Sequence, residues 1–476
     1  MKVSSSNFID SKRSALKVLI ARLHERFPFC SVLAMDCTAK AYSASAQGVG
    51  AGEFTMFSHK GFVVRVMDEG SYAEYSFNSF DEGCIDTVIS RITDQLIPLT
   101  KVLPEKIGVM RHSVLAEEEC TFSGSTEFEI HPDDMGEEAI LGKLSALREN
   151  VKARDGRIID AQARLNWQEI HKLYLSPVKD MEQNIMWASG ALAAMALKGQ
   201  ELKSSYHPCS VIGGAEVMDK MEDCIGELVT NLIDLLDSEA ITPGEYECIC
   251  SPSVTGMIVH EAFGHGVEMD MFVKDRALAK YRIGEQVASP LVTMYDTASN
   301  ASDAGTYFFD DEGIMAHNTV IIENGILRRG ISDLLSASTL GTEPTGNGRR
   351  ESYKRKAYTR MSNTFFTGGH DTLEDMIASV KYGFLLDEPT SGMEDPKNWG
   401  IQCMVGFARE IKDGKFTGKI FSPVVLTGYV PDLLMSISMM SENVEISGSG
   451  YCGKGHKEYV KVSDGGPYIK ARVCLG

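Results

Sequence analysis

The pattern of hydrophobic residues changes near residue 240, and this change constrains the fold more than any other feature of the chain. Before it, long stretches have apolar residues at helical spacing; after it, short strand-like runs alternate with frequent glycines. Thr242-Pro243-Gly244 marks the boundary. We therefore predict an α+β fold, in which an N-terminal mixed α/β domain (residues 1–238) precedes a strand-rich C-terminal domain with a β-sheet or barrel-like architecture (residues 239–476).

The first half combines helical patterns with one strand-rich stretch. The apolar spacing predicts helices over residues 8–27, 80–97, 133–154, 178–203 and 214–238. The last of these carries one continuous apolar stripe. Between the first two helices, residues 31–77 read as strands and turns, with a hairpin around Glu69-Gly70.

The second half contains strand-like runs joined by glycine turns. Asn324-Gly325 and Asp413-Gly414 are expected to close hairpins, because this type of residue pair adopts the left-handed turn that joins antiparallel strands. Cys248-Ile249-Cys250 alternates like a buried strand, so we interpret its thiols as core packing. One isolated helix is predicted at about 253–267 inside this sheet-rich half.

Composition narrows the class of protein. A chain of 476 residues is long enough for two domains. The net charge of -19 argues against nucleic acid as a direct partner, because a phosphate-binding surface needs a basic excess. No stretch approaches the roughly 20 apolar residues of a membrane span, and the N-terminus lacks a signal-peptide pattern. The 11 cysteines are scattered, as is typical of reduced thiols, and a cytoplasmic location is expected.

Residues 260–265 (HEAFGH) form a candidate metal-binding motif. His260 and His265 are five positions apart, with Glu261 beside the first; in the common zinc-peptidase motif the two histidines are four apart. On an ideal helix five positions correspond to a divergence of roughly 140°. One metal ion can therefore be shared only if the helix is bulged or ends between the ligands. Gly264 and Gly266 were expected to supply the backbone freedom for that distortion.

A catalytic zinc usually has three protein ligands, so two histidines require a third residue from elsewhere. The candidates are Glu268, Asp270, His317, His370, Cys452 and His456. Cys452 ranks first, because the glycine-rich loop 448–455 can bring backbone and thiolate close to a metal. Glu268 and Asp270 are alternatively placed to orient a metal-bound imidazole. His456 is more typical of a surface histidine.

Two further groups admit two interpretations each. Asp310, Asp311 and Glu312 form a carboxylate cluster that either binds a cation or belongs to a turn at the end of a strand. Arg349 and Arg350 follow a Gly-Asn-Gly sequence and either fix a substrate carboxylate or pair with the acidic cluster.

Taken together, the motifs resemble those of the TldD/PmbA family, formerly called modulators of DNA gyrase. The matching segments, in chain order, are 260–270 (HEAFGHGVEMD), 309–313 (FDDEG), 346–350 (GNGRR), 360–364 (RMSNT) and 452–454 (CGK). Residues 61–78 (GFVVRVMDEGSYAEYSFN) are similar to the family's N-terminal signature, so that the resemblance covers nearly the whole chain.

The resemblance implies a zinc metallopeptidase that cuts short or unfolded peptides. It places His260, His265 and Cys452 on the zinc ligands and Glu261 on the catalytic glutamate, which acts as general base. Because all four residues are present, the chain is similar to the TldD-like, catalytic type of subunit. The resemblance further implies a dimer, either of this chain with itself or with a PmbA (TldE)-like partner that lacks the motif.

Two other classes of function compete with the peptidase. In the first, the chain is a non-catalytic peptide-binding subunit whose metal is structural, with four protein ligands. In the second, it regulates DNA topology by acting directly on DNA or gyrase, against which the net charge of -19 and the lack of a basic stripe both weigh.

Overall fold

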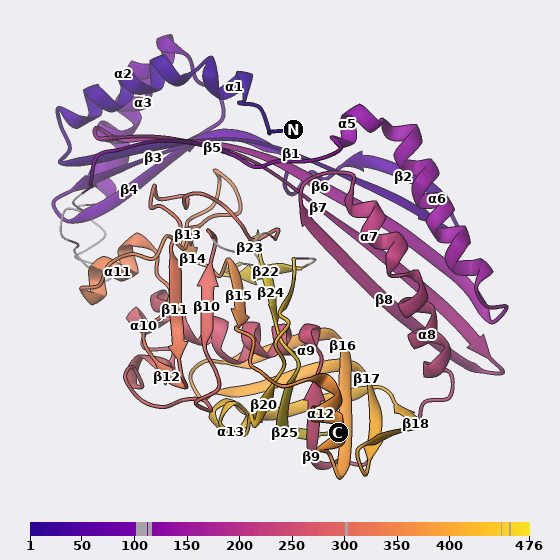
Figure 1. The fold of residues 1–476 in the computed structure, drawn as a ribbon. Coiled ribbons are helices and arrows are strands. Elements are labelled where there is room, and N and C mark those ends of the chain that lie inside the picture. Colours follow the sequence, from indigo (N-terminus) through magenta and orange to yellow (C-terminus); the bar gives the residue numbers. More distant parts are fainter. Residues whose placement is uncertain (101–111, 113–116, 300–302, 449, 457) are drawn as a thin grey trace.

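The computed structural model describes residues 1–100, 112, 117–299, 303–448, 450–456 and 458–476. A long, curved sheet from the first half of the chain carries helices on its outer face, and the strand-rich second half lies against its inner face (Figure 1). Ser449, in the glycine-rich loop 448–455, lies outside the described residues. The mixed helix and strand content and the strand-rich second half agree with the predicted α+β class.

The first-half sheet has the strand order β4-β3-β1-β6-β7-β5, with β2 added to β1 and β8 added to β7. Its strands are β1 (Phe29–Ser45), β2 (Gly48–Glu53), β3 (His59–Asp68), β4 (Ser71–Phe77), β5 (Cys120–Ser125), β6 (Ile158–Leu175), β7 (Lys179–Lys198) and β8 (Glu201–Ile212). The helices are α1 (Asn7–Asp10), α2 (Arg13–His24), α3 (Ile85–Ser90), α5 (Pro132–Met135), α6 (Glu137–Ala153), α7 (Val217–Asp223) and α8 (Ile225–Leu235). A π-helical turn over Arg91–Leu96 extends α3.

The inner and outer faces of this sheet are both buried. Along β1, Val32 and Ala34 pack into the cluster formed with α2 and α3, whereas Leu33 and Met35 pack against the second half of the chain. Alternate residues of a strand point to opposite faces, so β1 contributes to two cores.

The helix predicted over 178–203 is wrong, because this stretch forms β7 and the start of β8. Its run MWASGALAAMAL is rich in alanine and almost wholly apolar, which hides the period of two. In the structure β7 pairs antiparallel with both β6 and β8, and both of its faces are covered. Tertiary burial thus overrides the helical propensity of the alanines.

The predicted helix over 214–238 is divided into two. Its apolar stripe is buried as expected, but α7 ends and α8 begins at Cys224. The other predicted helices in this half are found with small shifts, including one interruption at Gly136, whose φ is +82°.

The second half builds two main sheets. A six-stranded sheet has the order β12-β11-β10-β15-β24-β21; in the other, β16, β9, β25, β19 and β17 follow one another, and the pairing of β17 with β16 closes the ring as a barrel. The two-stranded sheet β22–β23 lies beside β24 of the six-stranded sheet (Figure 1).

The bounds of these strands are β9 (Gly244–Cys250), β10 (Met294–Thr297), β11 (Asn318–Glu323), β12 (Ile326–Leu327), β15 (Asn363–Phe366), β16 (Tyr382–Asp395), β17 (Gly400–Lys412), β18 (Lys415–Phe421), β19 (Val424–Tyr429), β21 (Glu445–Ser447), β22 (Tyr451–Lys454), β23 (Glu458–Lys461), β24 (Ser463–Gly466) and β25 (Ile469–Leu475). The helices are α9 (Pro252–Ile258), α10 (Met269–Val273), α11 (Leu334–Leu340), α12 (Leu373–Ala378) and α13 (Val430–Met435).

The three predicted hairpin turns are confirmed. Glu69-Gly70 joins β3 to β4, Asn324-Gly325 joins β11 to β12, and Asp413-Gly414 joins β17 to β18. Each pair has positive φ at both positions, which matches the right-handed twist of the flanking strands. Cys248 and Cys250 are fully buried in β9, as the strand interpretation expected.

Contact between the two halves depends on the lack of a side chain at Gly61 in β3. A Cβ atom there would lie 2.5 Å from the ring of Tyr353, which is buried against the sheet. We expect Gly61→Ala to destabilise the protein by about 1–3 kcal/mol, measured as a shift of the guanidinium unfolding midpoint. Gly142→Ala is the matched control, because it adds a Cβ to open space on exposed α6 and should stabilise slightly. Equal effects of the two substitutions would contradict this packing.

Candidate metal centre

The helix that carries the HEAFGH motif contains the bulge that its histidine spacing requires. Ser251 caps α9 by accepting a hydrogen bond from the Val254 N–H, and Pro252 occupies the first turn. After Ile258 the helix widens into a π-helical segment over Val259–Gly264, which is followed by a 3₁₀ turn over His265–Val267. Hydrogen bonds in a π-helix join residues five apart, so this segment stacks positions that an α-helix would separate.

Both histidines therefore lie on one side of the helix. The ring centroids of His260 and His265 are 5.0 Å apart, with the rings nearly perpendicular. Cys452, from β22, brings its Sγ to 3.4 Å from His265 Nε2. One potential ligand atom from each of these three residues lies within 4.8 Å of the other two. All three side chains are largely buried.

Gly264 has a different role from the one expected. Its φ of −59° and ψ of −57° are helical, so the bulge does not use the conformational freedom of glycine. A Cβ atom at Gly264 would instead lie 2.2 Å from the Sδ atom of buried Met361. The missing side chain lets the ligand-bearing helix pack directly against the RMSNT segment.

A network of charges holds His265 from behind. Its Nδ1 atom lies 3.1 Å from the Glu268 carboxylate, and Lys454 Nζ donates to Glu268 at 2.9 Å and to Asp270 at 2.7 Å. Burial alone would raise the pKa of Glu268, but Lys454 and His265 lower it to about 2. A carboxylate on Nδ1 leaves Nε2 free to face Cys452, as in carboxylate–histidine–metal arrangements. Lys454 belongs to the same CGK segment as Cys452.

His260 has its own carboxylate neighbour. Asp464 of β24 places an oxygen 3.5 Å from His260 Nδ1, too far for a good hydrogen bond, and Nδ1 has no hydrogen-bond partner among the described residues. Burial raises the pKa of Asp464 to about 6. The ring is thus held more loosely than that of His265.

The donor set is suited to a soft divalent cation. Burial would raise the pKa of the Cys452 thiol, but His265 and His260 hold it well below its usual value. In return, although burial lowers imidazole pKa values, Cys452 raises the pKa of His260 to about 9. A bound metal would displace the protons that the Cys452 thiol and the two imidazoles share in its absence. In a tetrahedral zinc site, thiolate sulfur and imidazole nitrogen lie about 3.6 Å apart, close to the separation of Cys452 and His265.

Glu261 is half-buried. Its carboxylate, that of Glu394 in β16 and the ring of His265 each have an atom within 4.8 Å of the others. Burial and the charge of Glu261 together raise the pKa of Glu394 to about 7, although His265 acts in the opposite direction. Gly392 makes room for this arrangement, because a Cβ there would lie 2.4 Å from Glu261 Cγ. The structure therefore places a second acid beside the motif glutamate.

The remaining candidate ligands lie elsewhere. His317, His370 and His456 are exposed, and among the residues that the structure describes none joins the group around His260. Glu268 and Asp270 are engaged with Lys454. Within the described parts of the chain, this group holds three potential ligands and no fourth His, Cys, Asp or Glu.

The carboxylates of the FDDEG segment bind protein groups. Asp310 accepts hydrogen bonds from the backbone N–H groups of Glu312, Ile314 and Gly348. Asp311 contacts Lys172, and Glu312 forms an ion pair with Arg65 at 2.6 Å. All three acids are buried, and their contacts with β3 and β6 fasten the second half to the first-half sheet.

The two arginines of the GNGRR segment are likewise occupied. Arg349 donates to the backbone carbonyls of Met361 and Lys461, and its guanidinium lies over the ring of Tyr307. Arg350 pairs with Glu74 at 3.0 Å, so its guanidinium reaches the first-half sheet rather than the acidic cluster. These contacts favour a structural role.

Buried polar residues of the RMSNT segment position the metal-facing hairpin. Asp296 of β10 accepts hydrogen bonds from Ser362, Thr364 and Asn347. Arg360, which is almost fully buried, donates to the Cys452 and Glu458 carbonyls and thereby fixes β22–β23 beside the helix. The motif serves as scaffold for the cysteine.

Sequence reasoning did not identify Asp464 and Glu394, two acids that lie close to these residues. Each stands in a strand far from the HEAFGH motif, at a position where an acid has no distinctive neighbour. The glycines near them, Gly465 and Gly392, are the one local signal that a strand approaches other atoms closely there.

Comparisons with known proteins identify the family to which the chain is similar. A family model described as the PmbA/TldA metallopeptidase C-terminal domain matches residues 243–473. A metalloprotease of Methanocaldococcus jannaschii is 32% identical over 344 residues, which cover 70% of this chain and 75% of that protein. A zinc metalloprotease TldD homolog of Saccharolobus solfataricus is 30% identical over 52% of the chain, and the match spans about half, 55%, of that relative's length.

The fold also has a solved counterpart. The crystal structure of TldE from Thermococcus kodakarensis superposes with a TM-score of 0.73 over 96% of this chain and 99% of that chain, at 18% identity. Each helix within the described residues is too short or too polar to cross a lipid bilayer.

The carboxylate behind His265 provides a test of the centre. We expect Glu268→Gln to weaken zinc affinity by about 10- to 100-fold, because the ring loses the charge that orients it and raises its basicity. Affinity is measured by competition with a chromophoric chelator. Asp270→Asn is the control, since Asp270 contacts Lys454 at 2.7 Å but not the imidazole, and its loss should be smaller. Equal losses would contradict a specific role for Glu268.

Proposed function

Because the chain belongs to the TldD/PmbA family of metallopeptidases, we propose that it is a zinc-dependent peptidase whose zinc ligands are His260, His265 and Cys452 and whose general base is Glu261. The observation that carries the proposal is the convergence of these three buried donors beside a half-exposed carboxylate. A set of three protein donors leaves a position open, as catalytic rather than structural zinc requires. This weighs against the peptide-binding subunit with a structural metal.

When bound, zinc supplies Lewis acidity and lowers the pKa of water toward about 7. The chain's own residues handle the proton and the geometry. Glu261 accepts the proton from the attacking water and passes it to the leaving amine. Glu268 and Lys454 hold the His265 ring in its orientation, and Asp464 lies behind the ring of His260.

Glu394 is a second carboxylate that can share a proton with Glu261. The two carboxylates lie close together, and like charges at this distance disfavour ionisation of both groups. Because burial and the neighbouring Glu261 raise the pKa of Glu394 to about 7, we propose that Glu394 holds a proton in about half of the molecules near neutral pH and can share it with the Glu261 carboxylate.

The burial of the donors supports a short or unfolded peptide as substrate. His260 is 8% exposed and Cys452 is 3% exposed, so a scissile bond must leave a folded surface to reach them. An extended peptide can bind by adding to a sheet edge, which gives main-chain affinity with little sequence preference.

We further propose that the enzyme works as a dimer, with a second copy of this chain or with a PmbA (TldE)-like subunit. The likeness in fold to TldE supports a partner of the same architecture.

The net charge of -19 supports the absence of direct nucleic-acid binding. The 11 free cysteines are consistent with a reducing, cytoplasmic location. We retain 1–238 and 239–476 as the proposed domains.

Replacement of the base separates chemistry from metal binding. Glu261→Gln should retain the zinc content of the wild type and reduce peptide turnover by at least about 10²-fold, because the amide cannot accept the proton. Zinc is measured by elemental analysis and turnover with a quenched fluorescent peptide. Glu53→Gln, on an exposed strand, is the matched control and should leave both unchanged. Loss of zinc from Glu261→Gln would make Glu261 a ligand and contradict the proposed role.

The substrate class is tested with one protein in two states. A disulfide-bonded protein and its reduced, alkylated form have the same sequence but differ in folding. We expect the unfolded form to be cut and the native form to persist under the same conditions, because the donors are buried. Efficient digestion of the native form would refute the requirement for an unfolded chain.

A further inference from the structure

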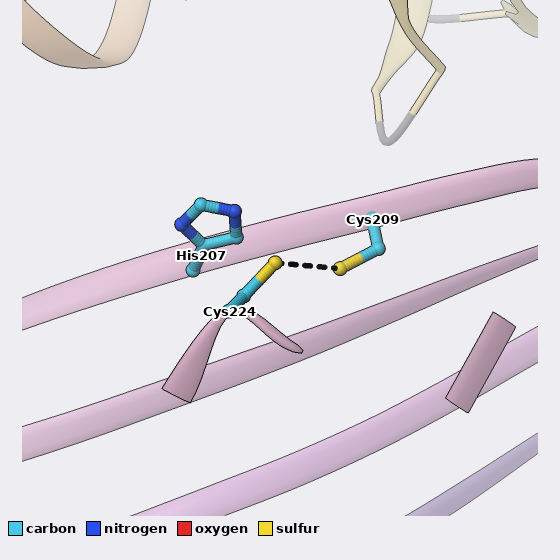
Figure 2. Close-up of side chains that lie close together, drawn as sticks. All are labelled: His207, Cys209 and Cys224. Atoms are coloured by element: carbon cyan, nitrogen blue, oxygen red, sulfur yellow. Dashed lines mark hydrogen bonds between the residues drawn. The ribbon is translucent and has the colours of Figure 1, made fainter. Parts of the chain in front are cut away.

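A second cluster of metal-ligating side chains lies in the first half of the chain, on the outer face of its sheet. His207 and Cys209 belong to β8, and Cys224 stands at the junction of α7 and α8 (Figure 2). One potential ligand atom from each lies within 4.8 Å of the other two. Cys209 is buried, whereas His207 and Cys224 are half-buried.

The local structure explains why three distant residues meet. His207 and Cys209 are two positions apart in a strand, so their side chains point to the same face, toward the covering helices. Gly190 of β7 pairs with Cys209 across the sheet, and a Cβ there would lie 2.3 Å from Met221 Sδ. The missing side chain lets α7 approach the sheet closely, and Cys224 follows directly after that helix.

The sulfur geometry matches a metal site. Cys209 Sγ and Cys224 Sγ are 3.9 Å apart. Two thiolates on a tetrahedral zinc, with Zn–S bonds of about 2.3 Å, lie about 3.8 Å apart. Bonded sulfurs would be separated by about 2.05 Å. The separation is thus compatible with two sulfurs around one cation, and it is too long for a disulfide bond.

The two thiols are affected in opposite directions by their contact. The hydrogen bond with Cys209 and the neighbouring His207 lower the pKa of Cys224 to about 5, whereas the same contact and burial raise the pKa of Cys209, whose proton a bound metal would have to displace. Cys224 in turn raises the pKa of His207. Glu227, three residues beyond Cys224 in α8, adds negative charge close to both.

We propose that His207, Cys209 and Cys224 bind a second zinc ion, distinct from the one between His260, His265 and Cys452, which clamps the α7–α8 junction to β8. Two thiolates and an imidazole form a soft donor set that selects zinc over calcium or magnesium. A structural zinc site has four protein ligands, and Glu227, whose carboxylate lies close to His207 and Cys224, is the candidate for the fourth.

The proposed clamp joins two elements, β8 and α8, that both contact the second half of the chain. Ser205, on the same face of β8 as His207, donates a hydrogen bond to Glu388 of β16 at 2.8 Å, and Asn231 of α8 donates to the same carboxylate at 3.0 Å. β16 also carries Glu394 at the proposed catalytic site. A metal that fixes β8 against α8 would therefore stabilise the two hydrogen bonds that hold β16, the strand of Glu394, in place.

Metal counting on reduced, full-length protein tests the proposal. After removal of metals and reloading with zinc in the presence of a phosphine reductant, elemental analysis should give two zinc ions per wild-type chain. Cys209→Ser, Cys224→Ser and Cys452→Ala should each retain one. Cys474→Ser removes an exposed cysteine outside both clusters and is the matched control, with two retained.

Cobalt loading of Cys452→Ala tests the cluster with His207, Cys209 and Cys224 all present. This measurement therefore does not depend on whether variants of these three residues fold. We expect one cobalt with a thiolate charge-transfer band, and loss of that band when Cys209→Ser and Cys224→Ser are both added. The absence of cobalt in Cys452→Ala would overturn the proposal while leaving the proposed function in place. Two zinc ions in wild type but two also in Cys452→Ala would contradict the catalytic ligand set and leave the clamp in place. A Cys209–Cys224 disulfide, with one zinc per chain even after reduction, would also overturn the clamp.

Discussion

The widened turn of helix at Val259–Gly264 is the constraint on which the candidate centre depends. An α-helix would point His260 and His265 in directions that no single ion can bridge, and the π-helical hydrogen bonds bring both rings to one side. The turn is held by its surroundings, since Gly264 packs against Met361 and the RMSNT segment in turn fixes the hairpin of Cys452. The positions of the π-helical turn, the RMSNT segment and the β22–β23 hairpin thus depend on one another.

Buried ion pairs join segments of the chain that are far apart in sequence. Lys454 pairs with Glu268 and Asp270 beside the candidate centre, and Arg65 pairs with Glu312 where the two halves meet. Leaving one member of such a set unpaired in the interior costs several kcal/mol. The acids and arginines that frame the motifs therefore act mainly through folding, by fixing how the first-half sheet lies against the strands that carry the site.

Sequence reasoning succeeded where a local rule applies. The five-residue histidine spacing required a bulged helix, and the glycine turns at 324–325 and 413–414 specified hairpins; all are present. It failed where burial on both faces removed the strand period, as at 178–203. Asp464, Glu394 and the His207, Cys209, Cys224 cluster depend on long-range packing. Cys224 in particular lay within what looked like one helical stripe, so nothing local marked the break that exposes its thiol.

Cys452 follows His265 by 187 positions, so the metal-binding set closes a very long loop. Chains are made from the N-terminus onward and tend to fold in that order. The helix with its two histidines and Glu261 can form while the cysteine has still to be synthesised. The proposed centre is therefore among the last features of the molecule to be completed. A growing chain carries the proposed base and two of the proposed donors without a finished site that could act on nascent polypeptides nearby.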